Sequence, residues 1–502
     1  MKEMKILFVS PEVVPFAKTG GLADVAGTLP IELSSLGHNV KTFMPYYRQI
    51  KKQDFGIKLV KPNLKAKIGS VDISFSLYHC QREKTDFYFI ENDEYYDREF
   101  LYGTPSGDYS DNAIRFAFFA SAVLSSAVAL NFKPDIIHYN DWQSALIPFY
   151  IKFKPLEYAF FSHAKTFFTV HNLAYQGLFP RETMHVLGIR DDFFTPDTLE
   201  FYGKLSFMKA AILYSDALST VSKGYAEEIL TPEFGCGLDG LLRARKDDLY
   251  GVINGVDYSK WSPKTDAYIK ANYDEKNVKN KSVCKKDLLE TMKLDASVQA
   301  PLLGVVSRLA EQKGIDIIAD SVEQMVKLGC NLIVLGTGDE KYHHLLTELS
   351  KKYPKNISVK IAFDNTIAHK IEAGCDMFLM PSRYEPCGLN QMYSLKYGTI
   401  PVVRGVGGLE DTIIDYTRNS KEGNGFKFSQ ANIADFMDAL RRAVNVYKNK
   451  KEWEQLTLKA MSCDFSWKNS AKEYIRIYNL IKTQEFNPVN KCSCSGKTCS
   501  AH

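Results

Sequence analysis

Ile6-Leu-Phe-Val9, with the turn Lys18-Thr-Gly-Gly-Leu-Ala-Asp24 that follows it, is the stretch of this sequence that says most about the fold. It indicates a short apolar strand, a glycine turn and a helical pattern that runs to about Leu36. Leu302 to Val306 opens a second block in the same way, with a strand, a polar turn and a helix that begins near Gly314. Two openings of one kind in a single chain predict two domains of related architecture.

Short β-branched runs alternate with helical stretches after each opening. The runs are Asp135 to His138, Phe167 to Val170 and Ala217 to Val221 in the first block, and Asn331 to Leu335, Asp376 to Met380 and Ile400 to Val403 in the second. They are too apolar to alternate, which is typical of parallel strands covered by helices on both faces. We therefore expect an α/β fold with two doubly wound, Rossmann-like domains, whose ligands bind beyond the carboxyl ends of the strands.

Length and composition exclude several classes of protein. A chain of 502 residues is longer than one hydrophobic core usually holds. With 45% hydrophobic and 24% charged residues, it is neither a disordered chain, a fibre nor a polytopic membrane protein. The net charge of +4 lacks the basic surplus of a nucleic-acid binder, so we expect no nucleic-acid partner.

The sequence also predicts where the protein works. Pro11, Glu12 and Pro15 interrupt the apolar N-terminus, which argues against a signal peptide. The uncharged stretch from Phe116 to Phe132 is rich in Ala and Ser, and this favours a buried helix over a membrane span. The ten cysteines lack disulfide spacing. We expect a cytoplasmic protein with no membrane partner.

The expected domain boundaries follow the composition. Residues 1–263 form the first domain, 264–298 a charged linker with a surface helix, and 299–464 the second domain. A last helix, at about 465–482, crosses back to pack on the first domain. The tail 487–502 has no apolar pattern and is expected to be disordered. Its Cys492, Cys494 and Cys499 could bind a metal together with His502, but tails without a partner cluster usually do not, so we expect no metal there.

Cationic groups follow the first strand of both blocks. Lys18 stands beside Gly20 and Gly21, where helix N-terminal amides attract an anion and the lysine adds a charge suited to phosphate. Arg308 and Lys313 occupy the equivalent place in the second block and can neutralise a departing diphosphate. The alternative for each is an ordinary turn with solvated cations.

Further polar residues follow other strands. Asp141, His171 and Asn172 can hydrogen-bond sugar hydroxyls, although Asp141 is equally placed to be a helix N-cap. Glu385, which Pro386 restricts to an extended conformation, can accept hexose hydroxyls. The run from Gly235 to Gly240 matches G-x-G-x-x-G, but no strand precedes it, so we expect no nicotinamide or flavin cofactor.

Taken together, these motifs resemble those of bacterial glycogen synthases and plant starch synthases over residues 1 to about 482. The motifs are Lys18-Thr-Gly-Gly-Leu-Ala-Asp-Val25, Thr169-Val-His-Asn-Leu-Ala-Tyr-Gln-Gly177, Asn254-Gly-Val-Asp257, Ser307-Arg-Leu309 with Gln312-Lys-Gly314, and Glu385-Pro-Cys-Gly388. The resemblance implies the two-domain GT-B glycosyltransferase fold, with two lobes facing across a deep cleft. It also implies retaining transfer of glucose from ADP-glucose to the non-reducing end of an α-1,4-glucan, without a metal or other cofactor.

The resemblance also assigns roles to residues. Glu385, Arg308, Lys313, His171 and Asp141 would form the catalytic set. The donor would be bound by Lys18, Gly20, Gly21, Asn172, Asn254, Arg308, Lys313, Glu385, Cys387, Gly388 and Leu389. Asp24 and Tyr95 are candidates on the acceptor side. Two alternatives stay open: a UDP-glucose-dependent transferase of the same fold, and a non-catalytic, glucan-binding regulatory relative.

Overall fold

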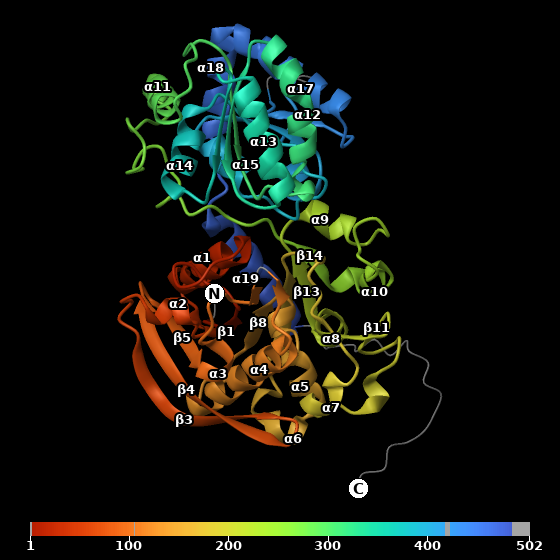
Figure 1. Ribbon diagram of the computed structural model, residues 1–502. Helices are drawn as coiled ribbons and strands as arrows, with labels where there is room; N and C mark the ends of the chain where they lie inside the picture. Colours follow the sequence, from red (N-terminus) through yellow and green to blue (C-terminus); the bar gives the residue numbers. More distant parts are fainter. Residues whose placement is uncertain (1–2, 105, 417–421, 484–502) are drawn as a thin grey trace. The chain divides into compact units, whose positions relative to one another are not determined.

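The computed structural model describes residues 3–104, 106–416 and 422–483 of the chain. The chain forms two compact units, which Figure 1 shows with the sequence running from red to blue. Unit 1 takes in the chain up to Thr220, Ile229–Tyr250 and the part from Ala471 onward; unit 2 consists of Val221–Glu228 and Gly251–Ser470. The chain therefore passes from one unit to the other at four places.

Unit 1 is built on a nine-stranded sheet. In the order β14-β13-β9-β8-β1-β2-β5-β4-β3, its strands are Leu249–Gly251, Ala217–Thr220, Lys165–Val170, Ile136–Asn140, Lys5–Val9, Asn39–Pro45, Thr85–Glu91, Val71–Arg82 and Lys58–Ile68. The strands from β13 to β5 pair in parallel, as predicted for the first block. The antiparallel extension β5-β4-β3 was not predicted; β3 ends the sheet as a largely exposed strand that carries four lysines and a proline. Charges and proline on an edge strand oppose pairing with other chains.

Helices and short strands complete unit 1. The α-helices are α1 (Gly21–Ser35), α2 (Arg48–Lys51), α3 (Asp93–Tyr96), α4 (Asn112–Ala129), α5 (Ile147–Phe153), α6 (Pro155–Tyr158), α7 (Thr183–Leu187), α8 (Phe207–Tyr214) and α10 (Asp239–Ala244). The 3-10 helices are η1 (Trp142–Ser144), η2 (Ala159–Phe161), η3 (Asp191–Phe193) and η4 (Lys246–Asp248), and the small sheets are β6 (Gly103–Thr104) with β7 (Gly107–Asp108), and β10 (Leu178–Phe179), β12 (Lys204–Ser206) and β11 (Glu200–Phe201). By length and composition alone, α4 qualifies as a membrane span, but 78% of it is buried in the protein, as expected for a core helix.

Unit 2 contains a six-stranded sheet in which all the strands pair in parallel. In the order β17-β16-β15-β18-β19-β20, the strands are Ile357–Ile361, Asn331–Gly336, Leu302–Val306, Met377–Met380, Ile400–Arg404 and Phe426–Phe428. The helices are α9 (Lys223–Glu228), η5 (Val278–Asn280), α11 (Lys281–Thr291), η6 (Glu311–Lys313), α12 (Ile315–Lys327), α13 (Glu340–Lys352), α14 (Asn365–Gly374), α15 (Asn390–Lys396), α16 (Gly407–Thr412), α17 (Ile433–Lys448) and α18 (Lys450–Met461). The order of strands reverses between β15 and β18, which is where doubly wound sheets bind ligands.

Two segments near the expected domain boundaries can be assigned to the units. The stretch 264–298 belongs to unit 2, because its helix α11 buries Leu288 and places the ammonium of Lys285 2.6 Å from Asp376. Helix α19 (Trp467–Thr483) begins in unit 2 and continues in unit 1, where the hydroxyl of Tyr478 lies 2.6 Å from a ring nitrogen of His138. The tail 487–502, with Cys492, Cys494 and Cys499, lies outside the described residues.

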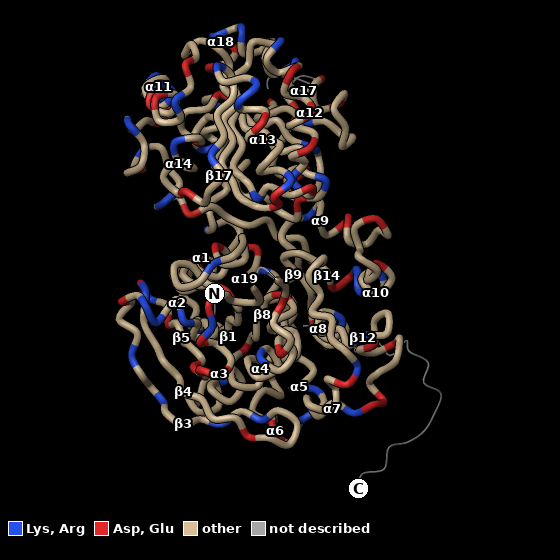
Figure 2. Tube along the Cα trace, viewed as in Figure 1, with Lys and Arg blue, Asp and Glu red and all other residues tan. Residues whose placement is uncertain are grey.

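Charges of both signs are mixed over each unit, as the blue and red segments of Figure 2 show. This distribution agrees with the near balance of 63 Lys and Arg against 59 Asp and Glu.

Candidate functional site

In unit 2, predicted site residues converge where the strand order reverses. Lys313 follows β15 and Glu385 follows β18, and these neighbouring strands bring the Lys313 ammonium within 2.6 Å of a Glu385 carboxylate oxygen. The same oxygen accepts a hydrogen bond of 3.0 Å from the hydroxyl of Ser382. Glu385 is 5% exposed, so its charge is held by these two partners away from water. A buried carboxylate between a cation and a hydroxyl is fixed in orientation before any ligand arrives.

Glycines fix the backbone that carries Glu385. Gly407 has a φ of 45°, and a Cβ there would lie 2.1 Å from the Glu385 carbonyl oxygen. The next amide, that of Gly408, donates to the same oxygen at 3.1 Å. The amide of Gly407 in turn donates to the carboxylate of Glu228 at 2.7 Å. Only a residue without a side chain fits at position 407, so the glycine pair after β19 sets the position of Glu385.

Arg308 is exposed and lies near the ion pair of Lys313 with Glu385. Its guanidinium donates to the side-chain oxygen of Gln312 at 2.9 Å, and Gln312 donates to the carbonyl of Tyr384 at 3.2 Å. Gly314, with a φ of 67°, turns the chain into α12; a Cβ there would lie 2.1 Å from the carbonyl of Pro381. The turns after β15 and β18 are therefore packed on each other, which brings Arg308, Lys313 and Glu385 together as one set.

The turn after Glu385 contains a thiol that burial keeps inert. Burial raises the pKa of Cys387 to about 12, although hydrogen bonds from Asn254 oppose the rise. Asn254 is 4% exposed, and its side-chain oxygen has no hydrogen-bond partner within the described residues. A thiol of such pKa stays protonated at neutral pH and is a poor nucleophile. Gly388 has a φ of 71°, and Leu389 is the N-cap of α15.

Unit 2 also has an exposed aromatic residue to which the sequence alone gave no role. Phe363 follows β17 at the carboxyl edge of the sheet and is 83% exposed, although large apolar rings are usually covered. An exposed aromatic ring at this edge offers a flat surface on which a planar base can stack. In the sequence, Phe363 is a single aromatic residue shortly after a β-branched run. This pattern is too common to predict a binding residue.

In unit 1, Lys18 is paired within its own motif. Its ammonium lies 2.8 Å from a carboxylate oxygen of Asp24, which stands in the first turn of α1. The side chains are 44% and 26% exposed, so a ligand can exchange for either partner at little cost. The pair with Asp24 lies at the surface, so the alternative of an ordinary turn with a solvated lysine stays open.

The same turn revealed a second residue that the sequence analysis missed. The carboxylate of Glu12, which is 4% exposed, accepts hydrogen bonds from the amides of Thr19 and Gly20. The glycine turn predicts that these amides face a bound anion, whereas in the structure they donate to a carboxylate of the chain itself. In the sequence, Glu12 is visible as an acidic residue between the strand and the glycine turn. Its position there indicates only an interruption of the apolar N-terminus.

Asp141 and His171 lie together at the ends of β8 and β9. The carboxylate of Asp141 accepts from the backbone amide of His171 at 2.7 Å, and no side-chain hydrogen bond caps the helix η1 that follows. Asp141 therefore stands at the N-cap position of η1, but its side chain bonds to the strand end of β9 and does not cap the helix. Asp141 has φ 54° and ψ 177°, a conformation found almost only in glycine, which marks a strained position held by its surroundings.

Burial controls the protonation of both side chains. It raises the pKa of Asp141 to about 7, and the nearby charge of Glu12 raises it further while the amides of His171 and Asn172 oppose it. Burial lowers the pKa of His171 to about 3, so the ring is neutral. The amide nitrogen of Asn140 donates to the carbonyl of Val9, which leaves its oxygen to accept from Nε2 of His171 at 2.9 Å. The second ring nitrogen of His171 then carries a lone pair.

The other predicted residues of unit 1 have simpler surroundings. The side-chain oxygen of Asn172 accepts from the amide of Ala174 at 3.1 Å, which shapes the loop after β9. Tyr95 is 8% exposed, and its ring packs against those of Tyr96 and Phe118. Its position on the acceptor side stays a prediction, because its ring serves mainly in packing.

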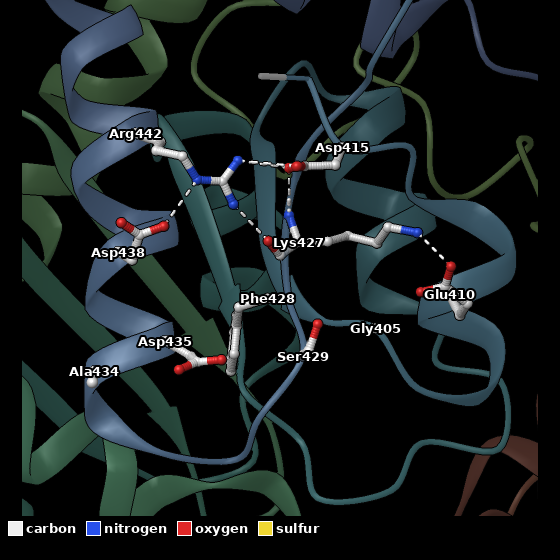
Figure 3. A pocket seen from close by; sticks show the side chains of 10 residues that line it. All are labelled: Gly405, Glu410, Asp415, Lys427, Phe428, Ser429, Ala434, Asp435, Asp438 and Arg442. Carbon is white, nitrogen blue, oxygen red and sulfur yellow. Dashed lines mark hydrogen bonds and ion pairs between the residues drawn. The ribbon is translucent and has the colours of Figure 1, made fainter. Parts of the chain in front are cut away.

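Neither a metal cluster nor the pocket of Figure 3 adds to this set of residues. Within the part of the chain that the structure describes, no group of three or more His, Cys, Asp or Glu side chains is arranged to hold a metal ion. A pocket of about 500 Å³ opens after β19 and β20 in unit 2 (Figure 3). Its charged groups pair with one another, as in the ion pairs of Lys427 with Glu410 and of Arg442 with Asp415. None of the predicted site residues lines it.

Comparison with known proteins gives the same two-part division. Residues 5–244 match the family described as starch synthase catalytic domain, and residues 291–459 match glycosyl transferases group 1. The chain is 47% identical to a glycogen synthase of Geotalea daltonii, covering 95% of this chain and 99% of the relative. It is 46% identical to a glycogen synthase of Koribacter versatilis, with 95% and 98% covered.

Solved structures agree on the fold. The catalytic domain of starch synthase IV from Arabidopsis thaliana, bound to ADP and acarbose, matches with a TM-score of 0.88 and 29% identity, covering 96% of this chain and all of that one. A sucrose-phosphate synthase from Thermosynechococcus elongatus matches with a TM-score of 0.59 at 15% identity, which bears on the fold alone. The expectation of a two-domain GT-B glycosyltransferase fold is thus confirmed.

Proposed function

The chain belongs to the family of bacterial glycogen synthases and plant starch synthases, glucosyltransferases that lengthen glucans, and on this premise we propose that its donor is ADP-glucose and its acceptor the non-reducing end of an α-1,4-glucan. The observation that carries the proposal is the set formed by Arg308, Lys313 and Glu385 at the strand-order reversal of unit 2. It combines two cations with a fixed carboxylate, which are the groups that a sugar joined to a diphosphate requires.

The proposed chemistry places charge where these residues can meet it. As the bond between the glucose carbon and the phosphate oxygen lengthens, negative charge grows on the diphosphate and positive charge on the sugar ring. Arg308 and Lys313 stabilise the departing diphosphate, and their fixed positions favour the transition state over the ground state. Glu385 accepts hydrogen bonds from hydroxyls of the glucose. The acceptor hydroxyl attacks from the face that the diphosphate leaves and gives its proton to a phosphate oxygen, so the anomeric configuration is retained.

Residues of unit 1 complete the proposal. Lys18 contributes positive charge toward the donor phosphates, with Gly20 and Gly21 leaving space for the ligand. Neutral His171, with Asn172 and Asp141, hydrogen-bonds sugar hydroxyls, and Asp24 and Tyr95 lie toward the acceptor. In unit 2, Asn254, Cys387, Gly388 and Leu389 line the donor alongside Glu385. Phe363 is our proposed stacking surface for the adenine of the donor.

Two observations support the proposed nucleotide of the donor and the cellular compartment of the protein. The Arabidopsis relative of the chain was solved with ADP and with acarbose. We extend this to an adenine nucleotide donor for the present chain. Buried thiols such as those of Cys330 and Cys375 are not joined in disulfides, which favours a reducing compartment and hence the cytoplasm.

The test is a transfer assay with the purified protein, glycogen and either ADP-glucose or UDP-glucose, in the presence of EDTA. We expect nucleotide release and incorporation of labelled glucose from ADP-glucose, and a product that an exo-acting amylase specific for α-1,4 linkages digests. Reactions without glycogen are the control for hydrolysis of the donor. Incorporation from UDP-glucose alone would favour the first alternative, and glycogen binding without turnover of either donor would favour a regulatory relative.

A further inference from the structure

Glu12 is a buried acid to which neither the family resemblance nor the proposed mechanism gives a role. It lies between β1 and α1 and is 4% exposed. An ionised carboxylate is seldom buried unless several donors surround it, because removing its charge from water is costly. The donors that surround Glu12 all come from the turn before α1 and from one neighbouring loop.

Each oxygen of Glu12 has two donors. One oxygen accepts from the amide of Thr19 and, at 3.2 Å, from the amide of Gly20. The other accepts from the hydroxyl of Thr19 at 2.5 Å and from the hydroxyl of Tyr102 at 2.7 Å. Such bonds to a charged acceptor are stronger than those between neutral groups. Four bonds therefore tie the turn and the Tyr102 loop to one carboxylate.

The occupied amides are those that a ligand's anion would otherwise attract. Backbone amides that converge just before a helix N-terminus form a binding place for phosphate or carboxylate. In this chain Glu12 fills that place. The adjacent cation, Lys18, stays outside it, with a 44% exposed side chain paired only at the surface with Asp24. In this turn the group left to attract an anionic ligand is therefore the ammonium of Lys18, because the amides of Thr19 and Gly20 already donate to Glu12.

We propose that Glu12 is a positioning residue for the donor: it acts as a built-in anion that fixes the turn and so places the Lys18 ammonium against the negative charge of the nucleotide sugar. The inference rests on the proposed function, because it concerns how the same donor is held. Glu12 itself touches neither the donor nor the acceptor. Its effect reaches the ligand through Lys18.

Two variants separate charge from hydrogen bonding. Glu12→Gln keeps a similar shape, and its amide nitrogen can donate to the two hydroxyls, so it removes mainly the charge. Glu12→Ala removes all four bonds. Tyr102→Phe removes one hydroxyl and leaves the turn's amides on Glu12. Glu372→Gln is the matched control, since Glu372 is also a buried acid, 1% exposed, but belongs to α14 of unit 2.

Four quantities are measured for each variant: KM for ADP-glucose, kcat, the Kd of ADP by calorimetry, and Tm. We expect Glu12→Ala to raise KM and the Kd of ADP by about tenfold or more, as for loss of a hydrogen bond to a charged group. Glu12→Gln should raise both by a smaller factor, and kcat should change less than KM. Tyr102→Phe, which removes one of the four bonds, should raise KM by a smaller factor than Glu12→Ala. Glu372→Gln should leave KM unchanged.

A double-mutant cycle with Lys18→Ala decides whether Glu12 acts through Lys18. In the Lys18→Ala background, Glu12→Gln should change KM by less than about twofold, because coupled residues are not additive. Equal factors in both backgrounds, or a lower Tm with an unchanged KM, would overturn the inference and leave Glu12 a purely structural residue. If Glu12→Ala does not fold, the Glu12→Gln cycle alone decides between these roles. Failure of the unaltered protein to bind ADP or use ADP-glucose would overturn the proposed function and, with it, this inference.

Discussion

Replacing Lys313 by methionine tests the central claim about unit 2. Methionine keeps an unbranched chain of similar length and removes the charge that lies 2.6 Å from Glu385. In the proposed reaction this charge stabilises the departing diphosphate, so its loss should slow the chemical step. We expect donor binding to weaken as well, but by a smaller factor than the fall in kcat.

The magnitude follows from the contacts of the pair. Removing one preorganised group that stabilises charge in a transition state costs about 3–4 kcal/mol, or about a 100- to 1000-fold loss of kcat. The stability effect is smaller. Glu385 loses its cation but keeps the 3.0 Å hydrogen bond from Ser382, and Lys313 is 20% exposed at its side chain. We therefore expect a loss of about 2 kcal/mol, below the about 3–5 kcal/mol that follows when a fully buried pair is broken.

Unit 2 supplies a matched control for this experiment. Lys285 and Asp376 form a second buried pair at 2.6 Å, with side chains 5% and 12% exposed. Asp376 precedes β18, whereas Glu385 follows it, so the two pairs lie at opposite edges of the sheet. Lys285→Met should lower Tm at least as much as Lys313→Met and leave kcat within about twofold of the unaltered enzyme.

The assay follows ADP release in the presence of saturating glycogen, with Tm measured on the same preparations. A Lys313→Met enzyme whose kcat stays within tenfold of the unaltered value would refute the role of Lys313 at the leaving group. Equal losses of kcat in the Lys313 and Lys285 variants would refute it too, because stability alone would then explain the result.

Four further predictions concern other parts of the site. The folded pKa of Asp141 is raised from 3.8 to about 7, so its ionisation destabilises the native state as the pH rises through this range. The free energy of unfolding of Asp141→Asn should therefore rise relative to that of the unaltered protein between pH 4 and 7, by up to about 4 kcal/mol at 1.36 kcal/mol per pKa unit. Urea unfolding at several pH values measures this difference. A difference in unfolding free energy that is constant with pH would contradict this reasoning. Phe363→Ala should leave Tm unchanged, because the ring is 83% exposed, and should raise KM for ADP-glucose about tenfold at constant kcat in steady-state kinetics; an unchanged KM would remove Phe363 from the donor site. Gly407→Ala should lower activity at least about 100-fold, since its Cβ would lie 2.1 Å from the Glu385 carbonyl oxygen. Gly20→Ala should fold with an unchanged Tm, because no atom lies within 4 Å of its Cβ, and any rise in its KM then reports on the ligand.

The sequence predicted the strands and the residues that follow them, because both are local properties. The runs from Asn331 to Leu335 and from Ile400 to Val403 became β16 and β19. Arg308 and Lys313 were singled out because they follow a strand. The pairing of Lys313 with Glu385, 72 positions apart, depends on β15 lying beside β18, and no local pattern specifies which strands are neighbours.

Glu12, which was missed, and Asp141, which was predicted, both have partners that lie far away in the sequence. The carboxylate of Glu12 accepts from the amides of Thr19 and Gly20 and from the hydroxyl of Tyr102, which is 90 positions away. Asp141 was considered as an N-cap because caps are local. Its carboxylate instead accepts from the amide of His171, which belongs to the neighbouring strand end. Sequence patterns give the position of a polar group on the chain, whereas its partner is decided by the order of strands in the sheet.

In each unit, one lysine of the predicted site is held against a carboxylate of the chain itself. Lys313 is paired with Glu385, and Lys18 is paired with Asp24 beside the carboxylate of Glu12. A cation that is already paired attracts a ground-state anion less strongly than a free one, but its position is fixed before the reaction. Such an arrangement gives up some binding of the intact donor. In the proposed reaction it favours the transition state, because the charge that develops on the leaving diphosphate is larger than the charge that the donor brings, and the fixed cations meet that increase without moving.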